Sequence, residues 1–304
     1  MGPTYVDLHT HSTASDGTLT PTALMQAAAH AGLAGIALTD HDTGNGLKEA
    51  AAEAARLGLR FVPGIEISAD YPAVPGACHI LGHFIDPDAA GLKDMSRLLL
   101  EARNARNPRI IARLNELGCR VSMEQVEAIA RRHVPDGKPL VIGRPHMAQA
   151  LIDAGCVSSI KQAFDVYLGE GGSAYFPKER LTPRQSIECI HNAGGLATLA
   201  HPIQMKLDGP QTQTIVGFLR DAGLDGIEVW HADHGERERG FYRELARRYE
   251  LVATGGSDFH GHNKADIALG RGKNNVRVPV EILDRLEARW RQIHHGGTET
   301  QRTP

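Results

Sequence analysis

The stretch Thr4-Tyr-Val-Asp-Leu-His9 predicts a short strand that ends on a histidine, and His11 follows two residues later. One His-x-His pair is weak evidence for a metal site, because alternating histidines on a strand often face solvent. The arrangement recurs, however, since further metal-binding residue types stand at or near the ends of later apolar runs. These side chains are His9, His11, Asp16, His41, Glu66, His79, His201, Asp258 and His260. They offer carboxylate oxygens and imidazole nitrogens without thiolate, which suits Mn, Fe or Zn.

Strand and helix patterns alternate along the first part of the chain. Thr20-Pro21 supplies an N-cap and a first-turn proline for a helix over 23–33, and a strand follows at 35–39. After residue 172 the alternation returns, with strands predicted at 195–200, 226–230 and 251–254. Repeated βα units predict an α/β fold with a parallel sheet, and ligands at strand carboxyl ends favour a barrel whose site lies on that face. Because seven strands can be counted, we expect the barrel to be incomplete or distorted.

Between these two parts, from about Ala89 to Gly172, the pattern changes to helices without intervening strands. Apolar residues recur there at three- and four-residue spacing over 92–117, 123–133, 144–154 and 158–168. We therefore predict a barrel domain made of residues 1–88 and 173–304. Residues 89–172 would form a helical insertion that caps the site and binds substrate.

The composition excludes several classes of protein. At 304 residues the chain can form one large α/β barrel. Its formal net charge is -3, so no general basic field favours a long nucleic acid or a membrane surface. The four cysteines are far apart and form no Cys-x-x-Cys pair, which argues against a zinc knuckle and a disulfide framework. Without a signal peptide or membrane-span pattern, we expect a cytoplasmic protein with no membrane and no obligate protein partner.

Several motifs resemble the signature of the PHP (polymerase and histidinol phosphatase) superfamily. They are Tyr5-Val-Asp-Leu-His-Thr-His-Ser12 with Ser15-Asp16-Gly17, Leu38-Thr-Asp-His-Asp42, Pro63-Gly-Ile-Glu-Ile67, Ala200-His-Pro202 and Gly256-Ser-Asp-Phe-His260. Ile142-Gly-Arg-Pro-His146 and Tyr175-Phe-Pro-Lys178 resemble the stand-alone bacterial branch of nucleoside 3′,5′-bisphosphate phosphatases and 5′-3′ exoribonucleases. The resemblance implies a distorted (βα)7 barrel that holds two or three divalent ions, often Mn²⁺.

The resemblance also implies how the ligands divide among the ions. His9, His11, Glu66 and Asp258 would hold the first ion. Glu66 would bridge to a second ion that also binds His79 and His201, while Asp16, His41 and His260 would hold a third. His83 is an alternative to His79, because residues four apart on a strand face the same side. Both assignments stay open at this point, and we favour His79.

Charge arithmetic favours a phosphoester substrate. Three divalent ions bring six positive charges, and the carboxylates of Asp16, Glu66 and Asp258 remove three, so a phosphate dianion with a hydroxide complements the cluster. Asp40 precedes the ligand His41. It would orient the attacking water or protonate the leaving oxygen. The alternative is that it only fixes a histidine tautomer.

The predicted insertion carries the groups expected to bind a second phosphate. Arg103 and Asn107 are four residues apart on one helical face, so both could reach one anion. Arg144 and His146 flank a proline where the resemblance places substrate contacts, and Lys178 follows Pro177 in a loop expected near the metal face. His231 and His234 stand at a strand end and are equally compatible with a pocket or an ordinary loop.

These features predict a metal-dependent phosphohydrolase that removes the 3′-phosphate of nucleoside 3′,5′-bisphosphates and leaves nucleoside 5′-monophosphates. A 5′-3′ exoribonuclease acting on short 5′-phosphorylated RNA is the nearest alternative, because the same site could cut a 3′ phosphodiester. Histidinol phosphate hydrolysis is a less favoured alternative, since the insertion offers more basic groups than a substrate with one phosphate needs. A non-catalytic, polymerase-associated module is a further class, but the full ligand set argues against it.

Overall fold

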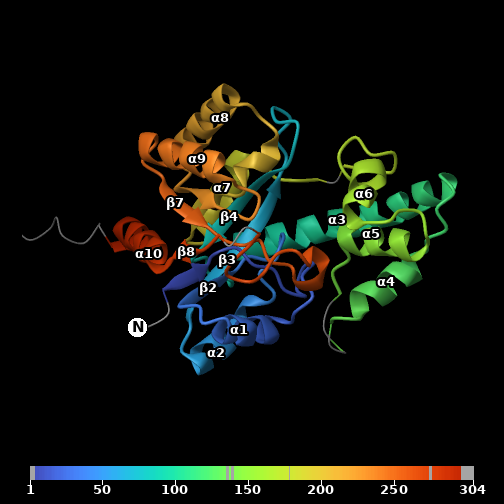
Figure 1. Ribbon diagram of the computed structural model, residues 1–304, viewed down its shortest axis with the longest axis horizontal. Coiled ribbons are helices and arrows are strands. Elements are labelled where there is room, and N and C mark those ends of the chain that lie inside the picture. Colours follow the sequence, from blue (N-terminus) through green and yellow to red (C-terminus); the bar gives the residue numbers. More distant parts are fainter. Residues whose placement is uncertain (1–3, 135–136, 138–139, 178, 274–275, 296–304) are drawn as a thin grey trace, which may run out of the picture.

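A curled eight-stranded sheet forms the centre of the protein (Figure 1). The computed structural model describes residues 4–134, 137, 140–177, 179–273 and 276–295. The strands lie in the order β7-β6-β5-β4-β3-β2-β1-β8. Their bounds are β1 (Tyr5–Asp7), β2 (Gly35–Leu38), β3 (Arg60–Ala69), β4 (Cys78–His83), β5 (Leu196–Leu199), β6 (Gly226–Trp230), β7 (Val252–Gly255) and β8 (Val278–Pro279).

The sheet curls until its first and seventh strands meet. The backbone N–H of Leu8, just after β1, donates to the carbonyl of Gly255 in β7 at 3.3 Å. Thr10 forms a parallel bridge with Phe259 one step further along. Seven strands therefore surround one interior, and the expected distorted (βα)7 barrel is confirmed. The short strand β8, which the sequence pattern did not predict, pairs antiparallel with β1.

Strand β4 causes the main distortion. β1, β2 and β3 are parallel to one another, as are β5, β6 and β7, whereas β4 is antiparallel to both β3 and β5. The expectation of a fully parallel sheet is wrong at β4, because only residues 70–77 link β3 to β4 and a parallel crossover needs about a dozen or more. The start of β4 therefore lies at the same end of the barrel as the carboxyl ends of the parallel strands.

Helices cover the outer face of the barrel. They are α1 (Pro21–His30), α2 (Leu47–Leu57), α7 (Pro183–Asn192), α8 (Gly209–Asp221) and α9 (Glu236–Arg248). Leu24, Ile187 and Leu245 from these helices join a core with strand residues Ile36 and Ile227. The predicted start of α1 is confirmed, since the Thr20 hydroxyl accepts the Ala23 N–H at 3.1 Å. No helix in the described part of the chain is long and apolar enough to span a membrane.

The carboxy-terminal helix α10 (Val280–His295) closes the barrel at the end opposite the helical insertion, as Figure 1 shows. Leu283 and Leu286 are fully buried against Val6, Leu8 and Leu196 from the barrel interior. Apolar side chains fill the end of the barrel that α10 covers. Polar groups that converge inside the barrel therefore face the end next to the insertion.

The insertion lies at the right of Figure 1. It consists of α3 (Ala90–Glu116), α4 (Met123–Arg131), α5 (Arg144–Asp153), α6 (Ile160–Ala163) and the π-helical turn Phe164–Leu168. Leu92 and Leu99 of α3 belong to the barrel core, whereas Ile110 and Leu114 belong to a separate core with Leu151. One continuous helix therefore connects the two cores. Short 3-10 turns follow β5 at Pro202–Met205 and β7 at Gly261–Lys264.

Candidate metal centre

Glu66 stands at the centre of the predicted ligand cluster and is fully buried in β3. Its Oε2 lies 3.3 Å from His9 Nε2, 3.3 Å from His11 Nε2 and 3.0 Å from His41 Nδ1. Its Oε1 lies 2.8 Å from His79 Nδ1 and 2.9 Å from His201 Nε2. These five histidines come from different parts of the chain, so the closed barrel brings them to one carboxylate.

Strand direction explains why His79 reaches this cluster. His79 is the second residue of β4, and the antiparallel course of β4 puts it at the carboxyl end of β3. His83, at the other end of β4, lies inside the barrel with its Nε2 3.0 Å from the Leu8 carbonyl. The structure therefore places His79, and not His83, beside Glu66.

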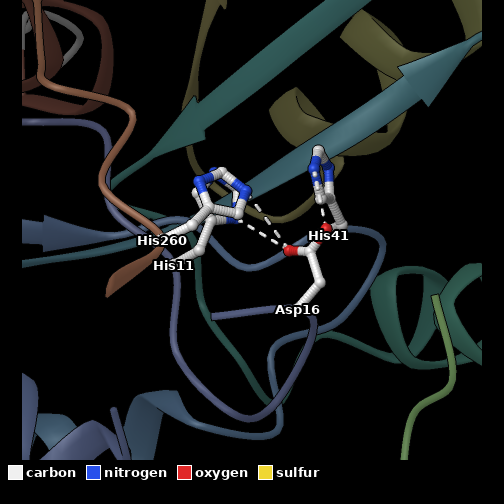
Figure 2. Close-up of side chains that lie close together, drawn as sticks. All are labelled: His11, Asp16, His41 and His260. Carbon is white, nitrogen blue, oxygen red and sulfur yellow. Dashed lines mark ion pairs between the residues drawn. The ribbon is translucent and has the colours of Figure 1, made fainter. Parts of the chain in front are cut away.

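Asp16 gathers a second group of histidines (Figure 2). Its carboxylate oxygens lie 3.3 Å from His260 Nε2, 3.9 Å from His11 Nδ1 and 3.9 Å from His41 Nε2. Asp258 joins the two groups, since its Oδ1 lies 3.5 Å from His9 Nε2 and 3.4 Å from His11 Nε2. All nine predicted ligands thus converge at one end of the barrel.

Unsatisfied polar atoms show that this cluster fits metal ions. Six buried atoms of the predicted ligands make no hydrogen bond with any described residue: His9 Nε2, His11 Nδ1, His11 Nε2, His41 Nδ1, Glu66 Oε2 and His201 Nδ1. Each unsatisfied buried group costs about 1–3 kcal/mol, so such a concentration needs a compensating partner. Nitrogen and oxygen donors without thiolate suit Mn, Fe or Zn.

The electrostatics of the cluster differ from ligand to ligand. Burial lowers the pKa values of His9 and His11, but nearby carboxylates, Glu66 and Asp258 among them, raise the pKa of His9 well above its usual range and that of His11 to about 9. Burial alone would raise the pKa values of the carboxyl groups, but the surrounding histidines hold the pKa of Glu66 and of Asp16 well below the usual range. Burial lowers the pKa of His79 and of His260 to about 4. Ionised carboxylates and neutral imidazoles are the metal-ligating forms of these side chains.

The backbone is strained at two predicted ligands. His201 has φ 23° and Asp258 has φ 58°, both in the left-handed region that residues other than glycine rarely adopt. Such conformations cost about 1–3 kcal/mol and persist where the surroundings fix them, most often at functional sites. The strain therefore agrees with a functional role for this end of the barrel.

Comparison with known proteins identifies the fold family. A family model described as PHP domain matches residues 7–130. The 3′,5′-nucleoside bisphosphate phosphatase of Chromobacterium violaceum is 33% identical over 294 residues, which cover 93% of this chain and 97% of that protein. The chain belongs to the PHP family. Its predicted resemblance is thereby confirmed.

Other PHP proteins agree with this assignment. The 5′-3′ exoribonuclease Rnm of Escherichia coli is 34% identical over 256 residues, which cover 84% of each chain. A crystal structure from Bifidobacterium adolescentis, assigned as a metal-dependent phosphoesterase, superposes with a TM-score of 0.80 at 31% identity and covers 93% of this chain and 96% of that chain. This PHP chain is therefore a metal-dependent phosphoesterase by family and fold.

Asp40 lies beside the loop that carries Asp16 in the PHP site. Its Oδ1 accepts hydrogen bonds from the Ser12 N–H at 2.8 Å and the Ser15 hydroxyl at 2.6 Å, and its Oδ2 accepts the Ser12 hydroxyl at 2.7 Å. Neither oxygen contacts a histidine nitrogen among these hydrogen bonds. Asp40 thus braces the loop that carries Asp16, and its contacts support neither the acid–base role nor the tautomer-fixing role that the sequence suggested.

Two residues at the PHP centre were missed or undervalued by the sequence reasoning. Glu228, the third residue of β6, lies with its Oε1 3.1 Å from His9 Nδ1. His231 has its Nε2 3.5 Å from Asp258 Oδ2, and that nitrogen makes no hydrogen bond among the described residues. Burial would raise the pKa of Glu228, but His9 and its neighbours lower it to about 2. The available signal was a lone acidic residue in the otherwise apolar strand Gly226-Ile-Glu-Val-Trp230.

The predicted substrate residues of the insertion are mostly held by the PHP protein itself. Arg103 Nη2 donates to Asp42 Oδ2 at 2.7 Å, and Asn107 Nδ2 donates to the Ile142 carbonyl at 3.0 Å. Each of the two side chains therefore has a protein partner, and their sharing of one anion stays a prediction. His146 Nδ1 accepts the Gly143 N–H at 3.0 Å. Lys178 lies outside the described residues.

A group of arginines is nevertheless linked to the PHP metal centre through Arg103, whose partner Asp42 follows the candidate ligand His41. Arg144 donates to the Leu168 carbonyl at 2.9 Å, and its Cζ lies 5.6 Å from the ring centroid of Phe164 and 5.9 Å from that of Tyr175. Burial, together with the charges of Arg144, Arg103 and Arg180, lowers the pKa of Arg106 to about 9. The buried Nε atoms of Arg106 and Arg180 make no hydrogen bond with any described residue. Like charges gathered with unused donors indicate an anion site.

Proposed function

We propose that this protein removes the 3′-phosphate of nucleoside 3′,5′-bisphosphates and releases nucleoside 5′-monophosphates. One observation carries the proposal: a partly buried arginine group is linked to the metal centre through Arg103. Arg103 joins the two directly, because its partner Asp42 follows the candidate ligand His41 in the chain. A substrate with two phosphates would present one to each group.

The metal centre would hold the reacting phosphate. Following the resemblance, His9, His11, Glu66 and Asp258 would hold a first ion, Glu66, His79 and His201 a second, and Asp16, His41 and His260 a third. Mn²⁺ is the proposed metal, with Fe or Zn as alternatives. When bound, the ions supply a nucleophile from water near neutral pH and stabilise charge on the phosphoryl oxygens. The protein's own task is then mainly to position the ester.

The insertion would hold the other phosphate. Residues 89–172 are proposed as the substrate-binding cap on a barrel made of residues 1–88 and 173–304. Arg106 and Arg144 belong to this cap, and Arg180 follows it. Arginine suits the role because its planar guanidinium binds phosphate with two parallel hydrogen bonds. We place the protein in the cytoplasm, since all four cysteines are free thiols.

A 5′-3′ exoribonuclease activity on short RNA is a second candidate, favoured by a cavity of about 440 Å³ that runs from His41 along α3. The residues that line this cavity include Lys93, Leu100, Arg103 and Val141. It offers room for a nucleotide beyond the scissile phosphate, with basic groups for its backbone.

The deciding experiment incubates the Mn²⁺-loaded protein with adenosine 3′,5′-bisphosphate and follows early products by phosphorus NMR. We expect adenosine 5′-monophosphate and inorganic phosphate. Adenosine 3′-monophosphate as the main product would reverse the two phosphate sites. Parallel reactions with a short 5′-phosphorylated RNA and with histidinol phosphate complete the test, since release only from one of these would replace the proposal.

A further inference from the structure

Both carboxylate oxygens of Glu228 are engaged with candidate metal ligands. Glu228 is fully buried, and its Oε1 lies 3.1 Å from His9 Nδ1. Its Oε2 accepts the backbone N–H of His201 at 2.6 Å. His9 follows β1 and His201 follows β5, so one side chain from β6 touches ligands that different strands deliver.

The contact with His9 sets which ring nitrogen faces the centre. A carboxylate can only accept hydrogen bonds, so Nδ1 of His9 carries the proton that points to Glu228. Nε2 then presents its lone pair on the opposite side of the ring. There it lies 3.3 Å from Glu66 Oε2 and 3.5 Å from Asp258 Oδ1, and it makes no hydrogen bond with the part of the chain that the structure describes. A second partner of this kind fixes the tautomer and orientation of a metal-binding histidine.

The contact with His201 holds a strained backbone. His201 has φ 23° and ψ 63°, which an ordinary residue leaves unless its surroundings prevent it. Its N–H is tied to Glu228, and its Nε2 lies 2.9 Å from Glu66 Oε1. The hydrogen bond to Glu228 therefore determines where the His201 ring points.

We propose that Glu228 is a positioning residue that orients His9 and His201 from behind the metal centre, an inference that rests on the metal centre of the proposed function. Glu228 does not act as a ligand itself. An ion held jointly by Glu228 and His9 would have to bind His9 Nδ1, but the hydrogen bond to Glu228 keeps a proton on that nitrogen. His231 does not complete such a site either, because its Nε2 lies 3.5 Å from Asp258 Oδ2.

Three variants separate positioning from charge. Glu228→Gln removes the charge and leaves one acceptor oxygen for two donors. Glu228→Asp keeps the charge but withdraws the oxygens by one methylene. Asp225→Asn is the matched control: this buried carboxylate, one residue before β6, accepts the Ala197 N–H at 3.1 Å at the other end of β5 and contacts no candidate ligand among the described residues.

The readout is Mn²⁺ affinity, measured by chelator competition with metal content counted by mass spectrometry, alongside the thermal unfolding of each variant. We expect Glu228→Gln and Glu228→Asp to bind Mn²⁺ about 10- to 100-fold more weakly, while folding. The ion assigned to Asp16, His41 and His260 should be retained. Asp225→Asn should unfold at a lower temperature with unchanged Mn²⁺ affinity.

Other outcomes overturn the proposal in distinct ways. Normal affinity in Glu228→Asp with weak binding in Glu228→Gln would reduce the role of Glu228 to its charge. Loss of one ion even at saturating Mn²⁺ would make Glu228 a ligand, and normal affinity in both variants would leave it without either role. This measurement uses no substrate. The Mn²⁺ affinities therefore test the role of Glu228 even if the proposed nucleotide activity is not found.

Discussion

Arg103 Nη2 lies 2.7 Å from Asp42 Oδ2, and both side chains are almost completely buried. This ion pair links helix α3 to the residue that directly follows the candidate ligand His41. Asp42 is itself fixed, since its Oδ1 accepts the Ser68 N–H at 3.1 Å and its φ is 59°. The insertion is therefore tied to the loop that carries a candidate metal ligand.

Breaking this pair should cost both stability and activity. Removing one partner of a buried ion pair leaves an uncompensated charge and typically destabilises by about 3–5 kcal/mol. We expect a loss of this order for Arg103→Ala in urea unfolding, together with weaker Mn²⁺ binding through the displaced His41. Arg97→Ala on the same helix is the control, because its ion pair with Glu101 is exposed and should matter little. Equal stability of the two variants would contradict the prediction.

Metal removal should abolish phosphoesterase activity. The purified protein is expected to carry two or three divalent ions, because buried unsatisfied ligand atoms need a partner. Chelation, or the substitution Asp258→Ala, should lower turnover by several orders of magnitude, since the metal supplies both nucleophile and charge stabilisation. Exposed His30→Ala should change neither metal content nor turnover. Full activity of a protein shown to be metal-free would contradict the assignment.

The two histidines of β4 should behave differently when each is replaced by glutamine. His79→Gln should weaken metal binding, because its Nδ1 lies 2.8 Å from Glu66. His83→Gln should retain the metals and lose stability, because its Nε2 bonds the Leu8 carbonyl inside the barrel. Metal content and thermal unfolding measured on both proteins check this. The reverse pattern would restore His83 as the ligand.

The arginine group should act on the phosphate that does not react. Arg106→Met should lower kcat/KM for adenosine 3′,5′-bisphosphate much more than for adenosine 3′-monophosphate, by about 2–5 kcal/mol for a buried charged contact. Arg109→Ala, exposed on the same helix, should leave this difference unchanged. If Arg106→Met lowers kcat/KM equally for both substrates, Arg106 acts at the reacting phosphate or in folding.

The convergence of the candidate metal ligands could be predicted from the sequence because most of them stand at or near the end of an apolar run, with His79 at the start of one. A barrel brings all such ends together, so spacing along the chain was sufficient. The reversal of β4 was harder to foresee, since it depends on the shortness of residues 70–77 rather than on periodicity. It was this reversal that separated His79 from His83.

Residues that act through hydrogen bonds were not predictable in the same way. Glu228 is one acidic residue in a strand, and only the fold shows that His9 and His201 meet it. Asp40 lies beside His41 in sequence, yet its side chain turns to Ser12 and Ser15. Arg103 and Asn107 share a helical face as expected, but their partners come from distant segments that helical spacing cannot reveal.

Helix α3 is anchored in both hydrophobic cores. Leu92 and Leu99 anchor one part of it in the barrel core, and Ile110 and Leu114 anchor the other in the insertion core, with Arg103 and Arg106 between them. The cap is thus joined to the barrel core by a helix, in which Pro108 removes one backbone hydrogen bond. Arg103 and Arg106 are consequently held at a position that the anchored helix sets relative to the loop carrying His41.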